Sequence, residues 1–419
     1  MKKLLLFAAL LASVVSQAQL EKKEELKTSK PIIIGTVDTI RSKILNEKLE
    51  ISVYVPNGYL NSLSQQNRYP VVYLLDGPGH FNYVVGMIEQ LSQVNGNTVC
   101  PEMIVVGILN NNRARDLTPS KASYDTTSTN QTATSNATQV GGTAFISFME
   151  KELMPFIDAR YPTQPYKVLI GHSLGGLAVM NTLINHPNLF NSYVAVDPSM
   201  WWDDNKFLEA SKKKLVYKDF SRATLYVGIA NTMDSDMTLK KLKKDSSADT
   251  RHIRAIFKMD DFIKKQKPKG LRYASKYYEH DTHGSVPLIA TYDAIRYIFS
   301  DYQLKVDNKD KNDSTIALAD KFEQRYQRIS KLYGYEVKPP EAEISRMALG
   351  FLKRKHFRKS EGFFKLNIEN YPDSFSVYDL YGDFFITIND KEQAIQQFRK
   401  ALSIKENEVT RNKLNKLLN

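Results

Sequence analysis

The strongest chemical signal in the sequence is a serine set among small residues, GHSLGG at 171–176. It directly follows the apolar stretch 167–170 and precedes an amphipathic segment that begins near Leu177. A strand, a tight turn and a helix in this order form a nucleophile elbow, in which the turn exposes the serine hydroxyl at the start of the helix. The pattern therefore predicts that Ser173 is a nucleophile for attack on a carbonyl carbon.

A serine hydroxyl needs a general base to take its proton, and histidine is the usual one. In elbow enzymes the base follows the nucleophile and the acid along the chain. His283 fits best, because its loop follows the strand-like stretch 272–278 and precedes the last helix of this region. His280 is the alternative, and His252 falls in a helical pattern, where a surface position is expected.

The acid that orients the base is expected after the apolar strand 224–229 and before His283. Asn231 comes first there, followed by Asp234, which we take as the candidate acid. Further alternatives stay open, and one of them is a Ser–His dyad without an acid. The other acidic candidates are Asp236, Asp245, Asp249 and Glu279.

The oxyanion formed by nucleophilic attack needs preorganised N–H donors. The amide of Leu174, directly after the nucleophile, is one candidate. The other is expected in the loop after the strand 71–75, where Pro78 has no N–H to donate and Gly77 or Gly79 must supply it. Gly77 is the preferred donor.

Short apolar strands alternate with amphipathic helices from about residue 30 to 300. The strands are expected at 51–55, 71–75, 104–108, 167–171, 193–196 and 224–228. Uninterrupted apolar strands separated by helices are typical of a mostly parallel sheet covered on both faces. The sequence therefore predicts an α/β domain over 30–300, with the elbow at one strand end.

The first 18 residues have the pattern of a signal peptide. Lys2 and Lys3 precede an apolar run, 4–15, that is too short to span a bilayer, and small residues two apart offer a cleavage site before Gln19. We expect a periplasmic or secreted protein with no transmembrane segment and no role in nucleic-acid binding.

The remainder of the chain is predicted to be helical. A polar linker is expected at 301–315, followed by an all-α domain over 316–419. Aromatic and small residues recur there with a period of 34, as in tetratricopeptide (TPR) repeats, and two units are recognisable at 341–374 and 375–408. A plain helical bundle is the alternative. This domain is expected to dock a protein partner or to buttress the first domain.

Composition excludes some classes of site. One cysteine among 419 residues rules out a disulfide framework and a cysteine-rich metal cluster. The formal charge is +12, and the stretch 205–277 alone contains 19 Lys and Arg against 8 Asp and Glu. Solvated helix faces are the simpler explanation of this excess, and the alternative is an anionic ester recruited with the help of Lys240, Lys241, Lys243 and Lys244.

Several segments together resemble the putative-esterase branch of the α/β-hydrolases, which includes enterobactin esterases and S-formylglutathione hydrolase. The matching segments are 74–77, 106–108, 112–119, 141–155, 171–176, 197–202 and 283–287. The resemblance implies carboxylic-ester hydrolysis through an acyl-enzyme, with no metal and no cofactor. It also implies a substrate site that includes His172, Arg113, Trp201 and Trp202, although the two tryptophans also fit a pair at the edge of the core.

The sequence thus predicts a serine esterase for a small or medium ester outside the cytoplasm. An acyltransferase and a siderophore trilactone esterase would use the same serine and histidine. A non-enzymatic binding protein that uses its helical repeats is the remaining alternative.

Overall fold

The computed structural model describes residues 30–56, 68–120, 141–304, 306–313 and 317–419. The predicted signal peptide, 1–18, lies outside the described residues. Among the described residues, no helix is both long and apolar enough to cross a membrane.

The central element is an eight-stranded sheet in the order β1-β2-β4-β3-β5-β6-β7-β8. The strands are β1 (Thr36–Ser42), β2 (Glu47–Tyr54), β3 (Tyr69–Leu74), β4 (Ile104–Ile108), β5 (Thr163–His172), β6 (Ser192–Val196), β7 (Thr224–Ala230) and β8 (Arg272–Tyr278). β2 pairs antiparallel with β4, and the run from β4 to β8 is parallel. The predicted mostly parallel sheet is confirmed.

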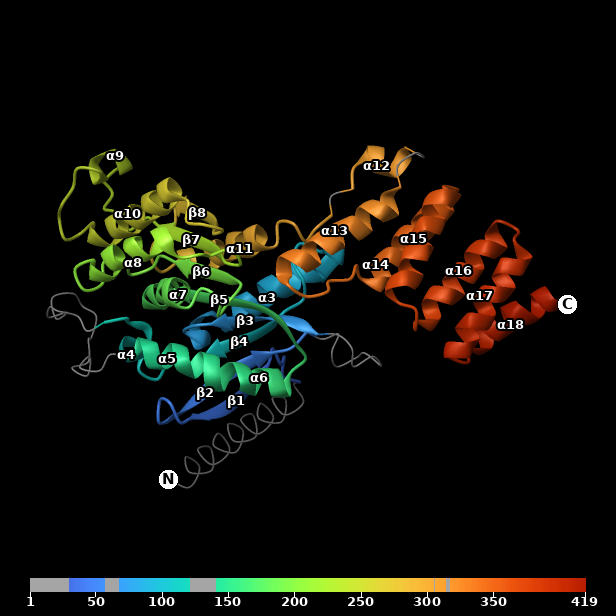
Figure 1. Ribbon diagram of the computed structural model, residues 1–419, viewed down its shortest axis with the longest axis horizontal. Coiled ribbons are helices and arrows are strands. Elements are labelled where there is room, and N and C mark those ends of the chain that lie inside the picture. Colours follow the sequence, from blue (N-terminus) through green and yellow to red (C-terminus); the bar gives the residue numbers. More distant parts are fainter. Residues whose placement is uncertain (1–29, 57–67, 121–140, 305, 314–316) are drawn as a thin grey trace, which may run out of the picture. The chain divides into compact units, whose positions relative to one another are not determined.

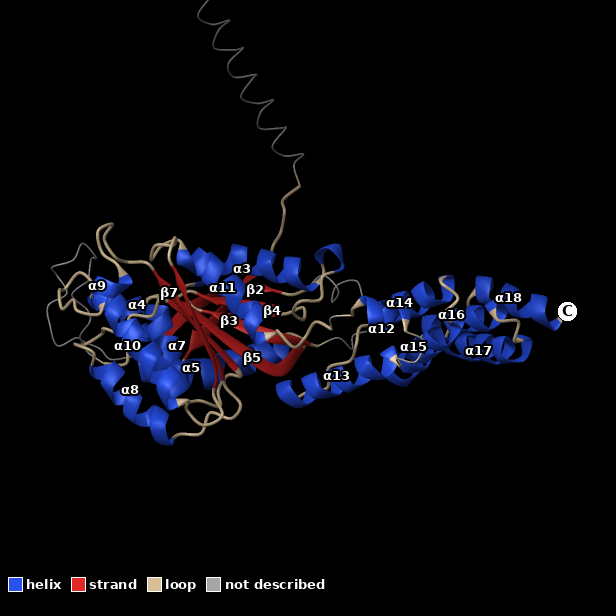
Figure 2. Cartoon of the chain, turned by 90° about the horizontal axis from the view of Figure 1, so that it is seen from above, coloured by secondary structure: helices blue, strands red, loops and turns tan. Residues whose placement is uncertain are grey.

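Helices cover both faces of the sheet, as Figure 2 shows. Successive side chains of a strand point to opposite faces, so Val71 and Tyr73 of β3 enter one apolar cluster while Val72 and Leu74 enter the other. The first face carries α5 (Gly142–Phe148), a π-helical turn (Met149–Leu153), α6 (Met154–Arg160), α7 (Leu174–Asn185), α8 (Lys206–Tyr217) and α10 (Arg251–Gln266). The second carries α3 (Gly77–Ser92) and α11 (Val286–Ile298). Both faces of the parallel strands are buried, which explains why their sequences are apolar without alternation.

Three short elements lie in connections between the longer ones. They are a 3₁₀ turn (Val94–Gly96), α4 (Arg113–Leu117) and α9 (Leu239–Leu242). In α4 the side chain of Asn112 accepts a hydrogen bond from the amide of Arg115, which caps the helix start and fixes where Arg113 leaves the backbone.

The described residues from 318 to 418 are mainly helical, as predicted (Figure 1). The helices of the described residues beyond 300 are α12 (Asn308–Asn312), α13 (Leu318–Tyr333), α14 (Glu341–Lys353), α15 (Phe357–Asn370), α16 (Phe375–Thr387), α17 (Lys391–Ile404) and α18 (Glu408–Leu418). The pair α16–α17 repeats the bounds of α14–α15 at an interval of 34 residues. The predicted linker at 301–315 includes α12, and assignment of the helix pairs to a TPR family stays a prediction.

Close packing within the second helix pair explains one of its small residues. A Cβ added to Gly382 of α16 would overlap the ring of Phe398 in α17. Phe398 is fully buried, so the ring has no room to retreat. Glycine at this position lets the two helices approach.

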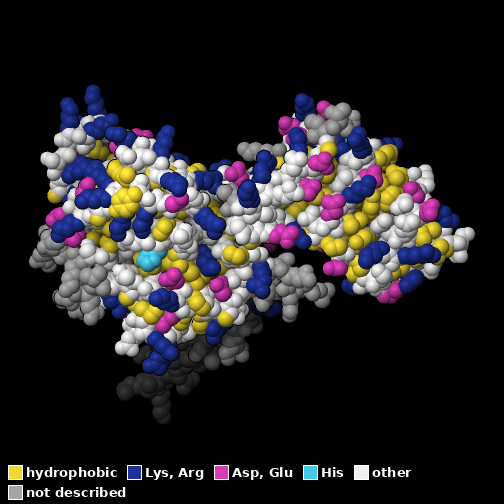
Figure 3. All heavy atoms as spheres, in the orientation of Figure 1, with side chains coloured by type: hydrophobic (Ala, Val, Ile, Leu, Met, Phe, Trp, Pro, Cys, Tyr) yellow, Lys and Arg dark blue, Asp and Glu magenta, His cyan; other side chains and the backbone are white. Residues whose placement is uncertain are grey.

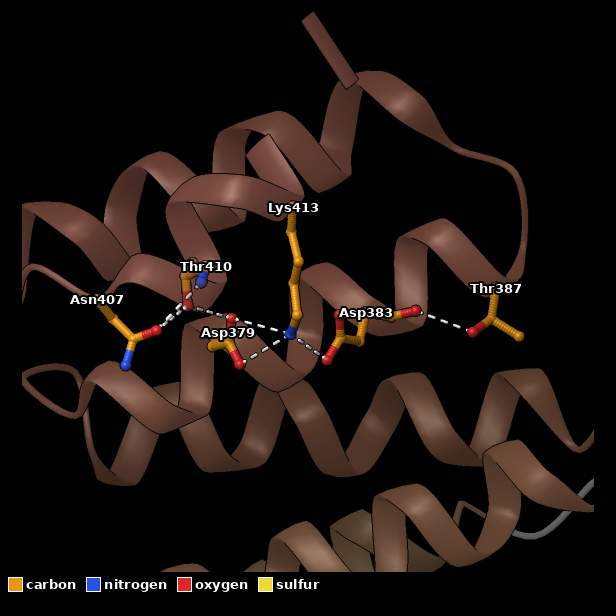
Figure 4. A network of polar contacts seen from close by, with 6 residues as sticks. All are labelled: Asp379, Asp383, Thr387, Asn407, Thr410 and Lys413. Atoms are coloured by element: carbon orange, nitrogen blue, oxygen red, sulfur yellow. Dashed lines mark hydrogen bonds and ion pairs between the residues drawn. The ribbon is translucent and has the colours of Figure 1, made fainter. Parts of the chain in front are cut away.

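Polar contacts attach the last helix, α18, to α16 (Figure 4). Lys413 forms ion pairs with Asp379 at 3.1 Å and Asp383 at 2.7 Å. The hydroxyl of Thr410 donates to the carboxylate of Asp379, and Asn407 caps the start of α18 by accepting from the amide of Thr410. Asp379 and Asp383 therefore both help to hold α18 against α16.

Helix α13 belongs to the same apolar cluster as the second face of the sheet. Ile329 and Tyr333 join that cluster with Phe299, and the ring of Tyr333 lies 4.7 Å from that of Tyr166 in β5. These contacts attach α13 to the sheet, and the role of the helical region stays a prediction.

Candidate active site

The serine of the GHSLGG segment occupies a strained turn between β5 and α7. Ser173 has φ 60° and ψ −116°, outside the ordinary regions for a residue with a side chain. Its amide donates to the carbonyl of Val196, and its carbonyl accepts from the amides of Leu177 and Ser199. The turn is therefore held by the next strand and by its own helix, and strain maintained in this way is typical of functional sites.

The glycines around the serine are required by contact. A Cβ at Gly171 would overlap the carbonyl oxygen of Gly175, and one at Gly176 would lie 2.9 Å from Cα of Pro198. Both obstacles are backbone atoms, which cannot rotate away. The elbow therefore forms only with glycine at these two positions.

Two predicted oxyanion donors begin helices at the same edge of the sheet. Leu174 is the first residue of α7 and Gly77 the first of α3, so their amides have no partner inside their helices. The amide of Gly79 instead donates to the carbonyl of Asp76, which favours Gly77 over Gly79 as a donor. β3 and β5 are adjacent, and the amide of Leu75 donates to the carbonyl of Ile170, so the two helix starts follow neighbouring strand ends.

The position of Gly77 accepts only glycine. A Cβ there would lie 2.6 Å from the carbonyl carbon of Gly107 in β4. The preceding Asp76 has φ 54°, so the chain turns abruptly from the end of β3 into α3. The first amide of α3 therefore comes three residues after the end of β3.

Arg113 connects the two strand ends. Its Nε lies 2.8 Å from Oδ1 of Asp76, and its terminal nitrogen lies 3.1 Å from Oδ2 and 3.2 Å from the carbonyl oxygen of His172. An open pocket of about 360 Å³ lies here, lined by Asp76, Pro78, Gly79, His80, Leu109, Asn110, Arg113 and His172. Two of the residues predicted to bind substrate, His172 and Arg113, therefore line a pocket beside the elbow, although the charge of Arg113 is paired.

The predicted base, His283, lies against a buried carboxylate. Its Nδ1 is 2.5 Å from Oδ2 of Asp197, whose side chain is fully buried. Asp197 follows β6 directly and has φ 43°, and its Oδ1 accepts from the amide of Ala230 at the end of β7. A carboxylate on Nδ1 leaves Nε2 of His283 as the nitrogen that can accept a proton.

The carboxylate on His283 corrects the prediction of Asp234 as the acid. Asp234 is exposed, and in the described part of the chain its contacts do not include His283. Sequence reasoning looked after β7, whereas Asp197 stands one strand earlier; β6 and β7 are adjacent, with Val196 opposite Gly228. The signal was an aspartate directly after the apolar strand 193–196.

Asn231 lies after β7, where the acid was expected, and hydrogen bonds to the loop that contains His283. Its amide donates to the carbonyl of Asp281, and its side chain donates to the carbonyl of Glu279. These two bonds fix the segment that leads into His283. The site after β7 thus positions the histidine loop rather than the imidazole itself. His280, the alternative base, is exposed in this loop.

A second histidine contacts the same carboxylate oxygen. Nε2 of His252 in α10 lies 2.8 Å from Oδ2 of Asp197, and its ring lies edge-on to that of His283 at 5.2 Å. The sequence pattern predicted a surface position for His252, and this prediction is wrong. Burial raises the pKa of Asp197, but hydrogen bonds from His252 and His283 outweigh it, so the pKa lies well below its usual value and the group is a carboxylate.

His172 lies next to the base and is uncharged. Its ring lies 4.5 Å from that of His283 and 6.0 Å from that of His80. Burial, and then the neighbouring His283, lower the pKa of His172 to about 3. A neutral ring beside the elbow adds no charge that would compete for the Asp197 carboxylate.

The hydroxyl of Ser173 lies 3.5 Å from that of Ser199, which is buried. Within the described residues, Ser173 and His283 do not hydrogen bond to each other. Hydrogen bonds between nucleophile and base are often long before substrate binds, so this geometry is compatible with a catalytic pair. Ser199 is a further residue at the site that the sequence did not single out.

The two predicted tryptophans have different surroundings. Trp202 is buried and donates from Nε1 to the carbonyl of Ser120, so it belongs to the core edge. Trp201 is half-buried, and the guanidinium of Arg251 lies 4.5 Å from the centre of its ring. Trp201 is therefore the tryptophan that remains available at the surface of this loop.

The lysines proposed to recruit an anionic ester lie in and after α9. Lys240, Lys241, Lys243 and Lys244 are all exposed, and Nζ of Lys241 donates to the carbonyl of Asp236. Figure 3 shows Lys and Arg side chains gathered over this part of the surface, at the upper left. Their role in substrate recruitment stays a prediction.

Asp197, His252 and His283 bring together nitrogen and oxygen atoms of the kind that bind divalent metals. These atoms lie within 4.8 Å of one another. The contacts to Asp197, at 2.5 and 2.8 Å, are shorter than the separation of about 3.3 Å expected between neighbouring ligands on a tetrahedral zinc ion. The distances fit hydrogen bonds, so the cluster is a proton-bearing network.

The chain matches the model of a known family, described as "Putative esterase", over residues 42–280, more than half of its length. That range includes the elbow, Asp197 and His252. It ends three residues before His283.

Individual relatives are similar over shorter stretches. The siderophore triacetylfusarinine C esterase of Aspergillus fumigatus is 35% identical over 74 residues, 17% of this chain and 25% of the relative. The ferri-bacillibactin esterase BesA of Bacillus subtilis is 27% identical over 146 residues, 32% of this chain and 49% of the relative. The chain thus spans between a quarter and a half of these two relatives.

Similarity to a solved structure extends further. An IroE-like serine hydrolase from Shewanella oneidensis has 29% sequence identity and a TM-score of 0.67, and the match covers 80% of this chain and 99% of that one. The match over the family model, together with the eight-stranded sheet, settles the classification. The chain belongs to the putative-esterase family of α/β-hydrolases.

Proposed function

We propose that the protein is a serine esterase that cleaves a small or medium carboxylic ester through an acyl-enzyme. The observation that carries the proposal is the strained Ser173 at the head of α7, whose chain neighbour His172 has its ring 4.5 Å from that of His283 in the His283–Asp197 pair. The strand, the elbow and the helix position the nucleophile. The buried carboxylate of Asp197 fixes the tautomer of the base, His283.

The reaction begins when the Ser173 hydroxyl attacks the ester carbonyl carbon and Nε2 of His283 takes its proton. The Asp197 carboxylate, held on Nδ1, stabilises the imidazolium that forms. The tetrahedral intermediate then collapses, the bond to the leaving oxygen breaks, and His283 returns the proton to the leaving alcohol. Water repeats the sequence on the acyl-enzyme, which releases the acid and restores Ser173.

The negative oxygen of each tetrahedral intermediate is assigned to the amides of Leu174 and Gly77. Both amides begin helices, so the helix dipoles add to the hydrogen bonds. Donors fixed in this way need no reorganisation when the charge develops, which is the largest electrostatic contribution in many acyl-transfer enzymes.

A siderophore ester is the second candidate substrate class, within the same reaction. Relatives named as siderophore esterases support it. The open pocket of about 360 Å³ beside His172 would accept part of a bulky ester. An acyltransferase reaction would use the same serine and histidine, with an alcohol in place of water.

Location and the helical region complete the proposal. The N-terminal pattern at 1–18 supports export to the periplasm or beyond the cell. The helix pairs α14–α15 and α16–α17 would dock a protein partner, while α13 buttresses the sheet.

Turnover of short p-nitrophenyl esters by the wild type and Ser173→Ala tests the reaction. The alanine variant is expected to lose at least about 10³-fold in kcat while it stays folded. Covalent labelling of the wild type by a fluorophosphonate, absent in Ser173→Ala, would identify the nucleophile. Equal turnover by the two proteins would overturn the proposal.

A further inference from the structure

The carboxylate of Asp197 is shared by two histidines, and the proposed reaction uses only one of them. Nδ1 of His283 and Nε2 of His252 both approach the same oxygen, Oδ2, at 2.5 and 2.8 Å. The other oxygen, Oδ1, accepts the amide of Ala230 at 3.0 Å. A fully buried carboxylate needs such donors, because an unpaired buried charge is strongly destabilising.

His252 is held firmly in this position. It lies in the first turn of α10, and the preceding Arg251 packs its guanidinium over the ring of Trp201. Trp201 and Asp197 belong to the same loop after β6. Two adjacent residues of α10 therefore grip this loop, one through a cation–π contact and one through the carboxylate.

The shared oxygen has a chemical consequence. A carboxylate that already accepts a hydrogen bond from His252 attracts the proton of the His283 imidazolium less strongly than an unshared one. His252 also prevents Asp197 from rotating away when His283 moves its proton. The second effect keeps the ring of His283 in the orientation that the reaction needs.

We propose that His252 is a positioning residue of the active site, which acts through the shared Asp197 carboxylate to hold the His283 ring in the orientation and tautomer that the reaction needs. This inference rests on the proposed serine mechanism. It adds a fourth residue to the Ser173–His283–Asp197 set and assigns a function to a histidine that touches neither nucleophile nor substrate pocket.

Other ionisable groups around His283 set the background for a pH test. They are Asp197 from the β6 loop, His252 from α10, His172 at the end of β5, and, behind His172, His80 of α3 and Arg113 of α4. Among these described groups, only His252 shares the carboxylate with His283, so removing it is the specific change.

The test compares pH profiles of kcat/KM for the wild type, His252→Leu and His252→Gln. Leucine removes the donor and is expected to move the midpoint of the acid limb up by about one pH unit, which lowers kcat/KM on that limb by up to about tenfold. Glutamine can donate from a similar position and is expected to restore the acid limb. His186→Leu, at the far end of α7 from Ser173, is the matched control and is expected to leave the profile unchanged.

A second measurement keeps the test decisive if His252→Leu folds poorly. Imidazole NMR titration of His283 in Ser173→Ala, with and without His252→Asn, reports its pKa directly, and asparagine is too short to reach Asp197. A higher pKa of His283 in the double variant supports the inference.

Two results would overturn the inference. They are superimposable profiles for the wild type and His252→Leu, or an unchanged His283 titration. Absence of Ser173-dependent turnover in the wild type would instead overturn the serine mechanism itself, so the two failures are distinguishable.

Discussion

The guanidinium of Arg113 binds both oxygens of Asp76, at 2.8 and 3.1 Å, and also reaches the carbonyl oxygen of His172 at 3.2 Å. Asp76 precedes Gly77, and His172 precedes Ser173. One side chain from α4 therefore ties together the two turns that carry the candidate oxyanion donors. The sequence resemblance placed Arg113 in substrate binding, whereas these contacts favour a role in aligning the two helix starts.

Arg113→Lys is expected to lower kcat about 10- to 100-fold with little change in KM, because lysine cannot make the forked contact and the two amides lose their alignment. Steady-state kinetics on a neutral and an anionic ester check this. A rise in KM confined to the anionic ester, with kcat preserved, would return Arg113 to substrate binding.

Asp197→Asn is expected to lower kcat about 10³- to 10⁴-fold, because an amide cannot stabilise the His283 imidazolium and favours the wrong tautomer. Asp234→Asn, an exposed substitution of the same kind, is the control and should change kcat by less than about twofold. Kinetics of both variants decide between the two aspartates. The reverse order of effects would restore Asp234 as the acid.

The elbow glycines predict a contrast in stability. Gly171→Ala should lower the free energy of unfolding by about 2 kcal/mol or more, because its Cβ meets the backbone of Gly175. Gly86→Ala, within α3, meets no atom within 4 Å and should raise it by about 0.5 to 1 kcal/mol. Urea unfolding measures both. Equal stability of Gly171→Ala and the wild type would mean that the turn relaxes.

His172 predicts a dependence of stability on pH. Its pKa is about 3 in the folded protein and near 6.5 when unfolded, so the unfolded chain binds the extra proton between these values. Stability attributable to His172 is therefore complete above pH 6.5 and falls as the pH drops toward 3. When the pH falls from 7.5 to 5, the free energy of unfolding of His172→Gln should therefore decrease by about 1 to 2 kcal/mol less than that of the wild type.

Urea unfolding at the two pH values tests this sign. A steeper loss of stability in His172→Gln than in the wild type would show that the histidine is protonated in the folded state. Since Asp197 titrates well below this window, it does not obscure the comparison.

Local patterns in the sequence determined the parallel sheet, the elbow at 171–176 and the helix pairs spaced by 34 residues. Each depends on neighbours in the chain: apolar runs predict buried strands, and glycines around Ser173 predict a tight turn. His283 could also be proposed as the base from the sequence, because the order of elements along the chain restricts where the base can lie.

The tertiary structure alone decided which carboxylate meets His283. Asp197 and His283 are 86 positions apart, and their contact depends on β6 lying beside β7 and on the left-handed backbone of Asp197. His252 was missed for a related reason: a helical pattern shows that one face of α10 is polar, but only packing shows which polar residue faces a buried carboxylate. The order of elements along the chain predicts where nucleophile, acid and base can occur. The order of strands in the sheet and the burial of side chains determine which residues come into contact.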